Sequence, residues 1–133
     1  MQIKQLIGET LTAIEGKRLD VDLTFHTATG KVFRFFHEQD CCESVWIEDI
    51  CGDLTDLLGT PIVQADAETS GDDPPGTTIK HGDDSFTWTF YRFATAKGQV
   101  VVRWCGESNG CYSESVSITM QGPPNQPIEW IER

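Results

Sequence analysis

The sequence contains no long hydrophobic run and none of the common catalytic fingerprints. No apolar stretch approaches the ~20 residues that cross a membrane as a helix, which argues against a membrane protein. The first residues, MQIKQLIG, lack the apolar core and small-residue cleavage site of a secretory signal. The chain also lacks a G-x-S-x-G elbow, a P-loop, an H-E-x-x-H motif and a dinucleotide-binding glycine pattern. The sequence therefore names no reaction.

Basic residues are scarce. Ten Lys and Arg residues stand against 21 Asp and Glu residues in a chain of 133, and the formal net charge is −11. The imbalance lies in residues 38–84, which hold 13 acids and a single Lys or Arg, Lys80. A field of this sign repels nucleic-acid phosphates and argues against direct binding of DNA or RNA. An excess of acidic residues is typical of a solvated surface that keeps a small protein soluble. The alternatives are that the acidic surface binds a basic partner protein, by mimicking nucleic acid, or that it binds metal ions.

Cysteine is present, but no C-x-x-C pair occurs among the five residues, so a zinc ribbon or a thioredoxin-type site has little support. The odd count and the absence of a signal predict a reducing compartment, and hence a cytoplasmic protein with five free thiols. Cys41 and Cys42 are adjacent. Neighbouring residues on a strand point to opposite faces, so this pair is not expected to ligate one ion together.

Long helical patterns are also missing, whereas short alternating segments are frequent. Strands are predicted at 10–15, 20–26, 31–37, from 45, and at 62–67, 85–96, 99–105 and 116–120, with short helices at 2–7 and 54–58. In the second strand, Val21, Leu23 and Phe25 are expected to face one way. The segment 70–84 reads as an acidic loop, mobile and dispensable for folding, and 121–133 as a tail that docks on the body.

We therefore expect one domain, residues 1–133, that is mainly β (α+β). Consecutive hairpins without long intervening helices exclude a parallel βαβ fold and predict antiparallel meanders. About eight strands either close into a barrel or pack as two sheets.

The sequence indicates an internal duplication, with halves of about 2–50 and 53–120. The segment FHTATGKV at 25–32 matches FATAKGQV at 93–100, and ESVWI at 43–47 matches ESVSI at 114–118. The alternative is that two hairpins converged on similar turn chemistry. A duplication predicts that loops 37–44 and 105–115 are equivalent, with Glu43 matching Glu114. Counting from the turn glycines also pairs His37 with Cys105.

These two loops hold most of the reactive side chains. The candidates for ligand or partner binding are His37, Glu38, Asp40, Cys41, Cys42, Glu43, Trp46, Glu107, Asn109 and Tyr112. A transition metal such as zinc would use His37, Asp40 and Cys42, although their spacing fits no known ligand set. A Cys41 or Cys42 nucleophile activated by His37 is disfavoured, because a low thiolate pKa needs positive surroundings. The third interpretation is a binding surface with aromatic anchors.

The motifs HEQDCCES at 37–44 and RWCGESNG at 103–110, with WTFY at 88–91, resemble a family of small uncharacterised proteins encoded by bacteriophages and bacterial genomes. The resemblance covers about residues 3–120 and brings no established activity. It implies a phage or prophage accessory protein acting in the bacterial cytoplasm. Members of that family tend to carry an aromatic residue where this chain has Cys105 and Cys111, which weakens any site built on those cysteines.

The predicted function is non-enzymatic binding of a host or defence-system protein, without cofactor, nucleic acid or membrane. The alternative is a metal- or small-ligand-binding protein that uses the paired loops 37–44 and 105–115, and an enzyme of unassigned class ranks third. The sequence gives no indication of the partner's identity or of the oligomeric state.

Overall fold

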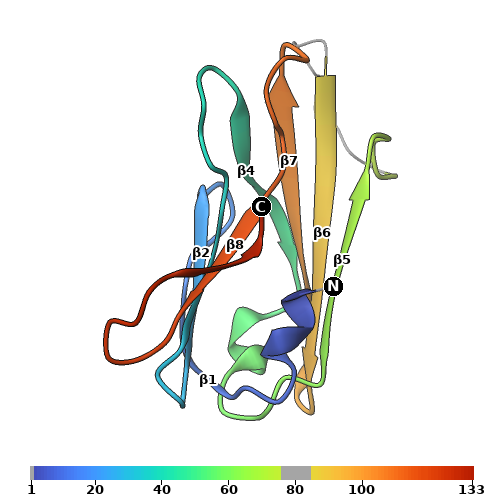
Figure 1. The fold of residues 1–133 in the computed structure, drawn as a ribbon. Coiled ribbons are helices and arrows are strands. Elements are labelled where there is room, and N and C mark those ends of the chain that lie inside the picture. The colour runs from blue at the N-terminus through green and yellow to red at the C-terminus, as the bar shows by residue number, and fades with distance from the viewer. Residues whose placement is uncertain (1, 76–84) are drawn as a thin grey trace.

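The computed structural model describes residues 2–75 and 85–133, which contain nine strands in two facing antiparallel sheets (Figure 1). The five-stranded sheet has the order β1 (Leu11–Glu15), β2 (Asp22–Thr27), β3 (Val32–Phe36), β8 (Ser117–Gln121), β9 (Glu129–Glu132). The four-stranded sheet has the order β4 (Ser44–Cys51), β7 (Gly98–Ser108), β6 (Ser85–Thr95), β5 (Gln64–Ser70). The predicted mainly β, antiparallel class is confirmed, and the sheets pack as a sandwich.

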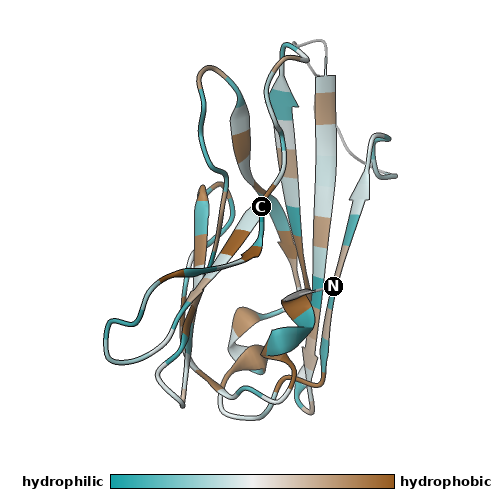
Figure 2. Cartoon of the chain, viewed as in Figure 1, coloured by the Kyte–Doolittle hydropathy of each residue, from teal (hydrophilic) through white to brown (hydrophobic). Residues whose placement is uncertain are grey.

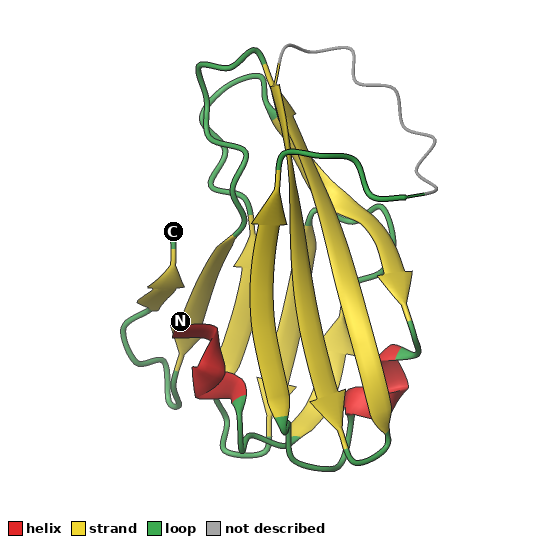
Figure 3. Cartoon of the chain, turned by 90° about the vertical axis from the view of Figure 1, so that its right-hand side faces the viewer, coloured by secondary structure: helices red, strands yellow, loops and turns green. Residues whose placement is uncertain are grey.

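Two short 3-10 helices, η1 (Gln2–Leu6) and η2 (Leu54–Leu57), lie at one end of the sandwich, while the loops that follow β3 and β7 lie at the other end (Figure 3). Gly8 follows η1 with a φ of 92°, a conformation that favours glycine and ends the helix as predicted. Asp53 caps η2, because its Oδ1 accepts a hydrogen bond of 2.9 Å from the backbone N–H of Thr55. No described helix is long and apolar enough to cross a membrane.

Strand order and direction agree with the predicted duplication. Each half runs helix, strand, hairpin, strand: η1, β1, β2, β3 and β4 in the first, and η2, β5, β6, β7 and β8 in the second. In each half three strands share one sheet, and the fourth crosses to the opposite sheet. There β4 pairs with β7 and β8 pairs with β3. The two halves therefore exchange strands, which joins them into one core.

Side chains alternate between the two faces of each strand, as the bands of hydropathy along the ribbons show (Figure 2). The inner faces carry the fully buried aromatic residues. Phe93 of the four-stranded sheet lies 5.1 Å from Phe25 and 5.8 Å from Phe35 of the other sheet, measured between ring centroids. Val21, expected to face inward with Leu23 and Phe25, instead precedes β2 and is 58% exposed.

The hairpin register corrects one detail of the predicted duplication. Phe25 pairs with Phe33 in the first hairpin, and the equivalent Phe93 pairs with Val100 in the second. The first turn is therefore one residue longer than the second. Residues at equal distances after Gly30 and Gly98 are thus not at equivalent positions. His37 consequently corresponds to Trp104 and not to Cys105.

The predicted acidic loop 70–84 is only partly within the described residues, since 76–84 lie outside them. Ser70 still belongs to β5 and pairs with Trp88 of β6. The Trp88 indole Nε1 donates a hydrogen bond of 3.0 Å to Asp73 Oδ1, and Trp88 is fully buried. At Asp73 the loop is therefore held against the sheet and is not mobile as predicted, while its dispensability for folding stays a prediction.

The predicted docking tail forms a strand. β9 pairs with β8, and Ile131 points inward and is 5% exposed. Trp130 lies on the outer face and is 40% exposed, with its ring centroid 6.0 Å from that of Phe36. The tail thus completes the five-stranded sheet.

Candidate functional site

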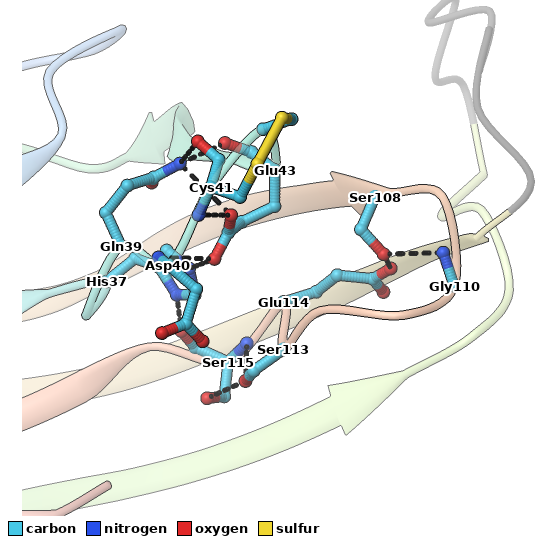
Figure 4. A network of polar contacts seen from close by, with 11 residues as sticks. His37, Gln39, Asp40, Cys41, Glu43, Ser108, Gly110, Ser113, Glu114 and Ser115 are labelled. Carbon is cyan, nitrogen blue, oxygen red and sulfur yellow. Dashed lines mark hydrogen bonds and ion pairs between the residues drawn. A yellow bond between two sulfur atoms is a disulfide. The ribbon is translucent and has the colours of Figure 1, made fainter.

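The two loops singled out by the sequence lie at the same end of the sandwich and are hydrogen-bonded to each other (Figure 4). His37, directly after β3, donates from ring Nδ1 to the backbone carbonyl oxygen of Ser115 over 2.7 Å. Ser115 belongs to the segment between β7 and β8. The predicted proximity of the two loops is therefore real, and His37 provides the link.

Glu43 is the centre of the first loop. Its side chain is fully buried, and its carboxylate faces His37 Nε2 at 2.7 Å. The backbone N–H groups of Asp40 and Cys41 donate to the same carboxylate over 3.0 and 2.8 Å. The hydrogen bond from His37, followed by those from the backbone, outweighs burial and lowers the pKa of Glu43 to about 2.

Gln39 completes this cluster. Its Nε2 lies within donating distance of the backbone carbonyl of Glu43 at 2.6 Å, of Glu43 Oε1 at 3.2 Å and of the Cys41 carbonyl at 3.1 Å. The loop is thus folded around one carboxylate, which accepts bonds from its own backbone as predicted. A buried charge with this many donors has a structural role.

Glu114, the equivalent of Glu43 in the second half, is also buried but is held by different partners. It accepts hydrogen bonds from the hydroxyls of Thr87 and Ser108, and Gly110 N–H donates to Ser108 Oγ. Burial is the largest single influence and raises the pKa of Glu114, but the hydroxyl bonds together lower it. The expectation that backbone N–H groups of its own loop bind Glu114 is wrong, because hydroxyls take their place.

This geometry does not assemble the proposed metal site. Both ring nitrogens of His37 face acceptors within the protein, so neither is available as a metal ligand or a general base. Asp40 is exposed, and among residues 2–75 and 85–133 no group of three His, Cys, Asp or Glu side chains is placed to hold a metal ion. The set of His37, Asp40 and Cys42 is therefore not supported by the structure.

The cysteines differ from the prediction of five free thiols. Cys41 and Cys42 form a disulfide in an exposed bend, which leaves Cys51, Cys105 and Cys111 free. That prediction relied on the odd number of cysteines and the absence of a signal, neither of which prevents a bond between two of the five. Burial raises the pKa of the Cys105 thiol to about 12, so this thiol is a poor nucleophile.

The remaining candidates are spread around this end of the molecule. Glu38 is exposed beside the Glu43 cluster, while Asn109 forms the predicted turn, its Oδ1 accepting from the backbone N–H of Cys111 over 2.9 Å. Glu107 and Tyr112 are half-buried and do not join the cluster around Glu43. The structure thus brings the two candidate loops together at one end of the fold, but fewer of their residues converge there than the sequence predicted.

A groove opens beside the Glu43 cluster, where the first β-hairpin faces β4. Its volume is about 510 Å³. Its walls are formed by Val21, Asp22, Arg34, Phe36, His37, Gln39, Glu43, Ser44, Val45 and Trp46. Trp46 was predicted as an aromatic anchor and lies here, half-buried.

Residues Arg34 and Phe36 of this groove were missed by sequence reasoning. The Arg34 guanidinium lies 4.0 Å from the centre of the Phe36 ring and is paired with Asp22 at 2.7 Å. Both residues alternate with the buried Phe33 and Phe35, so the period-two pattern placed them on the outer face. An exposed arginine two positions from an aromatic residue on that face was the available signal.

Comparison with protein families matches residues 4–118 to a domain of unknown function, DUF7448. The chain belongs to the DUF7448 family. The match covers both halves and both loops, in agreement with the expectation of an uncharacterised family. The chain matches no curated protein and no solved structure. The family match therefore brings no known activity to this DUF7448 protein, and the geometry of the site is the remaining guide to its function.

Proposed function

We propose that this DUF7448 protein is a non-enzymatic, phage-type accessory protein that binds a host or defence-system protein in the bacterial cytoplasm through the groove between β3 and β4. The observation that carries the proposal is that the reactive side chains at this end of the fold bond within the protein, whereas the side chains around them face solvent. The side chains of His37 and Glu43 are hydrogen-bonded to each other, and His37 is also bonded to Ser115. The solvent-facing positions beside them carry a mixture of apolar, aromatic, polar and charged side chains, among them Val21, Trp46 and Arg34.

The groove has the composition of a protein-docking surface. Val21 and the neighbouring Leu19 are 58% and 61% exposed, so two of the six exposed large hydrophobic side chains of the described residues lie close together at this position. The aromatic rings of Phe36 and Trp46 are half-buried in the wall. Such partly buried aromatic residues, surrounded by polar groups, are typical anchors of protein interfaces.

The charge around the groove indicates the partner's chemistry. Glu38 and Asp40 are exposed in the loop after β3 and line a smaller hollow that shares His37 with the groove. They belong to the segment 38–84, which carries 13 acids and a single Lys or Arg. A partner segment with apolar residues flanked by lysine or arginine would complement this surface. The acidic field also repels nucleic acid, which supports a protein partner.

The experiment compares two exposed valines. Immobilised wild-type protein, Val21→Asp and Val63→Asp are incubated with bacterial lysate, captured proteins are identified, and each is purified to measure its affinity. Val63 is 61% exposed on the edge away from the groove and is therefore a matched control. We expect Val21→Asp to weaken binding by about tenfold or more and Val63→Asp to leave it unchanged.

Affinity for the purified partner should also fall as salt rises, because the complementary charges are screened. A partner whose affinity is equal for both valine variants, or is insensitive to salt, would contradict the proposed groove.

A further inference from the structure

A second cleft opens on the opposite edge of the four-stranded sheet, beside β5, and has a volume of about 280 Å³. Its floor is the inner face of β5 and β6, and its walls are the segment 113–116 and the end of β9. The residues that line it are Ala67, Thr69, Thr87, Thr89, Tyr91, Ser113, Glu114, Ser115, Val116, Glu132 and Arg133. Six of these eleven residues carry a hydroxyl group.

The position of these hydroxyls is unusual for a β-sandwich. Along β6 the inward-facing residues change from the apolar ring of Phe93 to Tyr91, Thr89 and Thr87. Thr69 of β5 is the cross-strand neighbour of Thr89 and extends the hydroxyl row. Inner-face positions normally carry apolar side chains. This part of the face is thus adapted to a polar occupant.

Two of the hydroxyls belong to buried residues that line the cleft. Thr89 is 4% exposed and Tyr91 is 2% exposed, and within residues 2–75 and 85–133 neither side-chain oxygen is hydrogen-bonded. Neither oxygen is among the fully buried atoms that lack a partner, so both reach the cleft, where a ligand or water can bond to them. Burial, aided by the charge of Glu132, raises the pKa of Tyr91, so its hydroxyl stays protonated and can donate.

The cleft is held in shape by its surroundings. The Tyr91 ring packs 5.1 Å from Phe35 and 6.2 Å from Phe93, measured between centroids. A Cβ atom added to Gly106 would lie 2.6 Å from the Glu114 carbonyl oxygen, so glycine lets the wall segment rest directly on the sheet. Glu114 is fixed there by Thr87 at 2.8 Å. A site of this rigidity binds without a large ordering cost.

We propose that this cleft binds a small neutral polyhydroxy compound, of the size and chemistry of one monosaccharide unit. Hydroxyl side chains both donate and accept, which matches a ligand whose own hydroxyls do the same. Its volume of about 280 Å³ lies just below the ~300–1,000 Å³ typical of ligand pockets, as suits a ligand of a single ring. The site is distinct from the groove beside β4 and does not depend on the function proposed for it.

Other ligand classes fit the cleft less well. An anion would meet the carboxylates of Glu114 and Glu132 as well as the guanidinium of Arg133, so the lining offers it no net positive charge. A metal ion would find no group of three suitable ligands among the described residues. A nucleobase needs the open face of an aromatic ring for stacking, whereas the Tyr91 ring is packed against Phe35 and Phe93. The hydroxyl lining therefore favours a neutral sugar.

The test is an NMR titration of isotope-labelled protein with methyl α-D-glucopyranoside, methyl β-D-galactopyranoside and N-acetyl-D-glucosamine. Tetrahydropyran, a similar ring without hydroxyl groups, serves as the negative probe. We expect at least one sugar to produce saturable shifts at residues 69, 87–91 and 113–116, and tetrahydropyran to produce none.

Two isosteric variants test the hydroxyls of Thr89 and Tyr91 that face the cleft. Tyr91→Phe and Thr89→Val should each weaken sugar binding about threefold to tenfold, the effect of one lost hydrogen bond. Tyr112→Phe and Thr24→Val remove hydroxyls that do not line the cleft and should bind like the wild type. Absence of saturable shifts with all three sugars, shifts mapping elsewhere, or equal affinity for Tyr91→Phe and Tyr112→Phe would overturn the proposal.

Discussion

At the scale of single residues, one buried carboxylate organises the loop that carries most of the candidate site. Glu43 accepts hydrogen bonds from the backbone of Asp40 and Cys41 and faces the His37 ring, which in turn bonds to Ser115. Because the carboxylate is buried, each lost donor would leave charge without compensation. The loop between β3 and β4 is therefore a structured rim for the groove beside it.

The Glu43 interactions predict a pH-dependent contribution to stability. The pKa of Glu43 is about 2 in the folded protein, against 4.5 for an ordinary glutamate. A lowered pKa stabilises the fold fully above about 4.5 and loses this effect as the pH falls towards 2. Glu43→Gln should therefore be less stable than the wild type at neutral pH, and the difference should shrink below pH 4.5 in urea unfolding.

The exposed residue Glu38, in the same loop, supplies the control for that experiment. Glu38→Gln should follow the wild-type stability curve at every pH. A Glu43→Gln deficit that stays constant down to pH 2 would contradict a charge-based role for the carboxylate.

The cysteines give a second prediction at the residue scale. Protein unfolded without reductant should show three titratable thiols per chain, from Cys51, Cys105 and Cys111. After reduction the count should rise to five, because the bond between Cys41 and Cys42 opens. A count of five before reduction, in protein purified without reductant, would show that this pair is not bonded.

At the scale of elements, turns set the register in which strands meet. Gly52, between β4 and η2, has a φ of 107°, and a Cβ there would lie 2.6 Å from the backbone oxygen of Gln99. Gly71, after β5, has open space around its Cα. The backbone therefore requires glycine at position 52, whereas position 71 has room for a side chain.

Gly52→Ala should lower the free energy of unfolding by about 1–3 kcal/mol, since both the positive φ and the contact with Gln99 oppose a side chain. Gly71→Ala should change it by less than about 0.5 kcal/mol. Urea denaturation of both variants measures the difference. Equal stabilities would mean that the turn after β4 relaxes without cost.

At the scale of the whole molecule, the exchange of β4 and β8 between the halves makes the two sheets interdependent. Each sheet contains strands from both halves, and the aromatic core joins Phe93 of one sheet to Phe25 and Phe35 of the other. Neither half can then keep its sheet when the other unfolds, so unfolding should be cooperative.

Phe93→Ala tests that interdependence. Loss of a buried ring that contacts the opposite sheet should cost about 3–5 kcal/mol. Unfolding followed by tryptophan fluorescence and by circular dichroism should still give coincident transitions. Val63→Ala, at a 61% exposed position, should change stability by less than about 0.5 kcal/mol. Two separated transitions would show that the sheets unfold independently.

Much of the architecture was readable from local sequence signals. The alternation of Leu23 and Phe25, the stops at Gly8 and Gly59, and the Asn109-Gly110 turn each depend on residues close together in the chain. The repeated segments at 25–32 and 93–100 likewise predicted two related halves, and the order of the strands agrees with that prediction. The sequence indicated two candidate loops but not their contacts, because the bonds that hold His37 include a partner 78 residues away, Ser115.

The sequence by itself determined the strands, the turns and the repetition, since these follow from side-chain alternation and backbone preferences over a few residues. Only the tertiary structure decided that β4 and β8 exchange sheets, that His37 corresponds to Trp104, and that hydroxyls line the inner face beside β5. These features depend on which distant segments pack together. Packing is set by the summed shape and burial of the whole core, which no local pattern encodes.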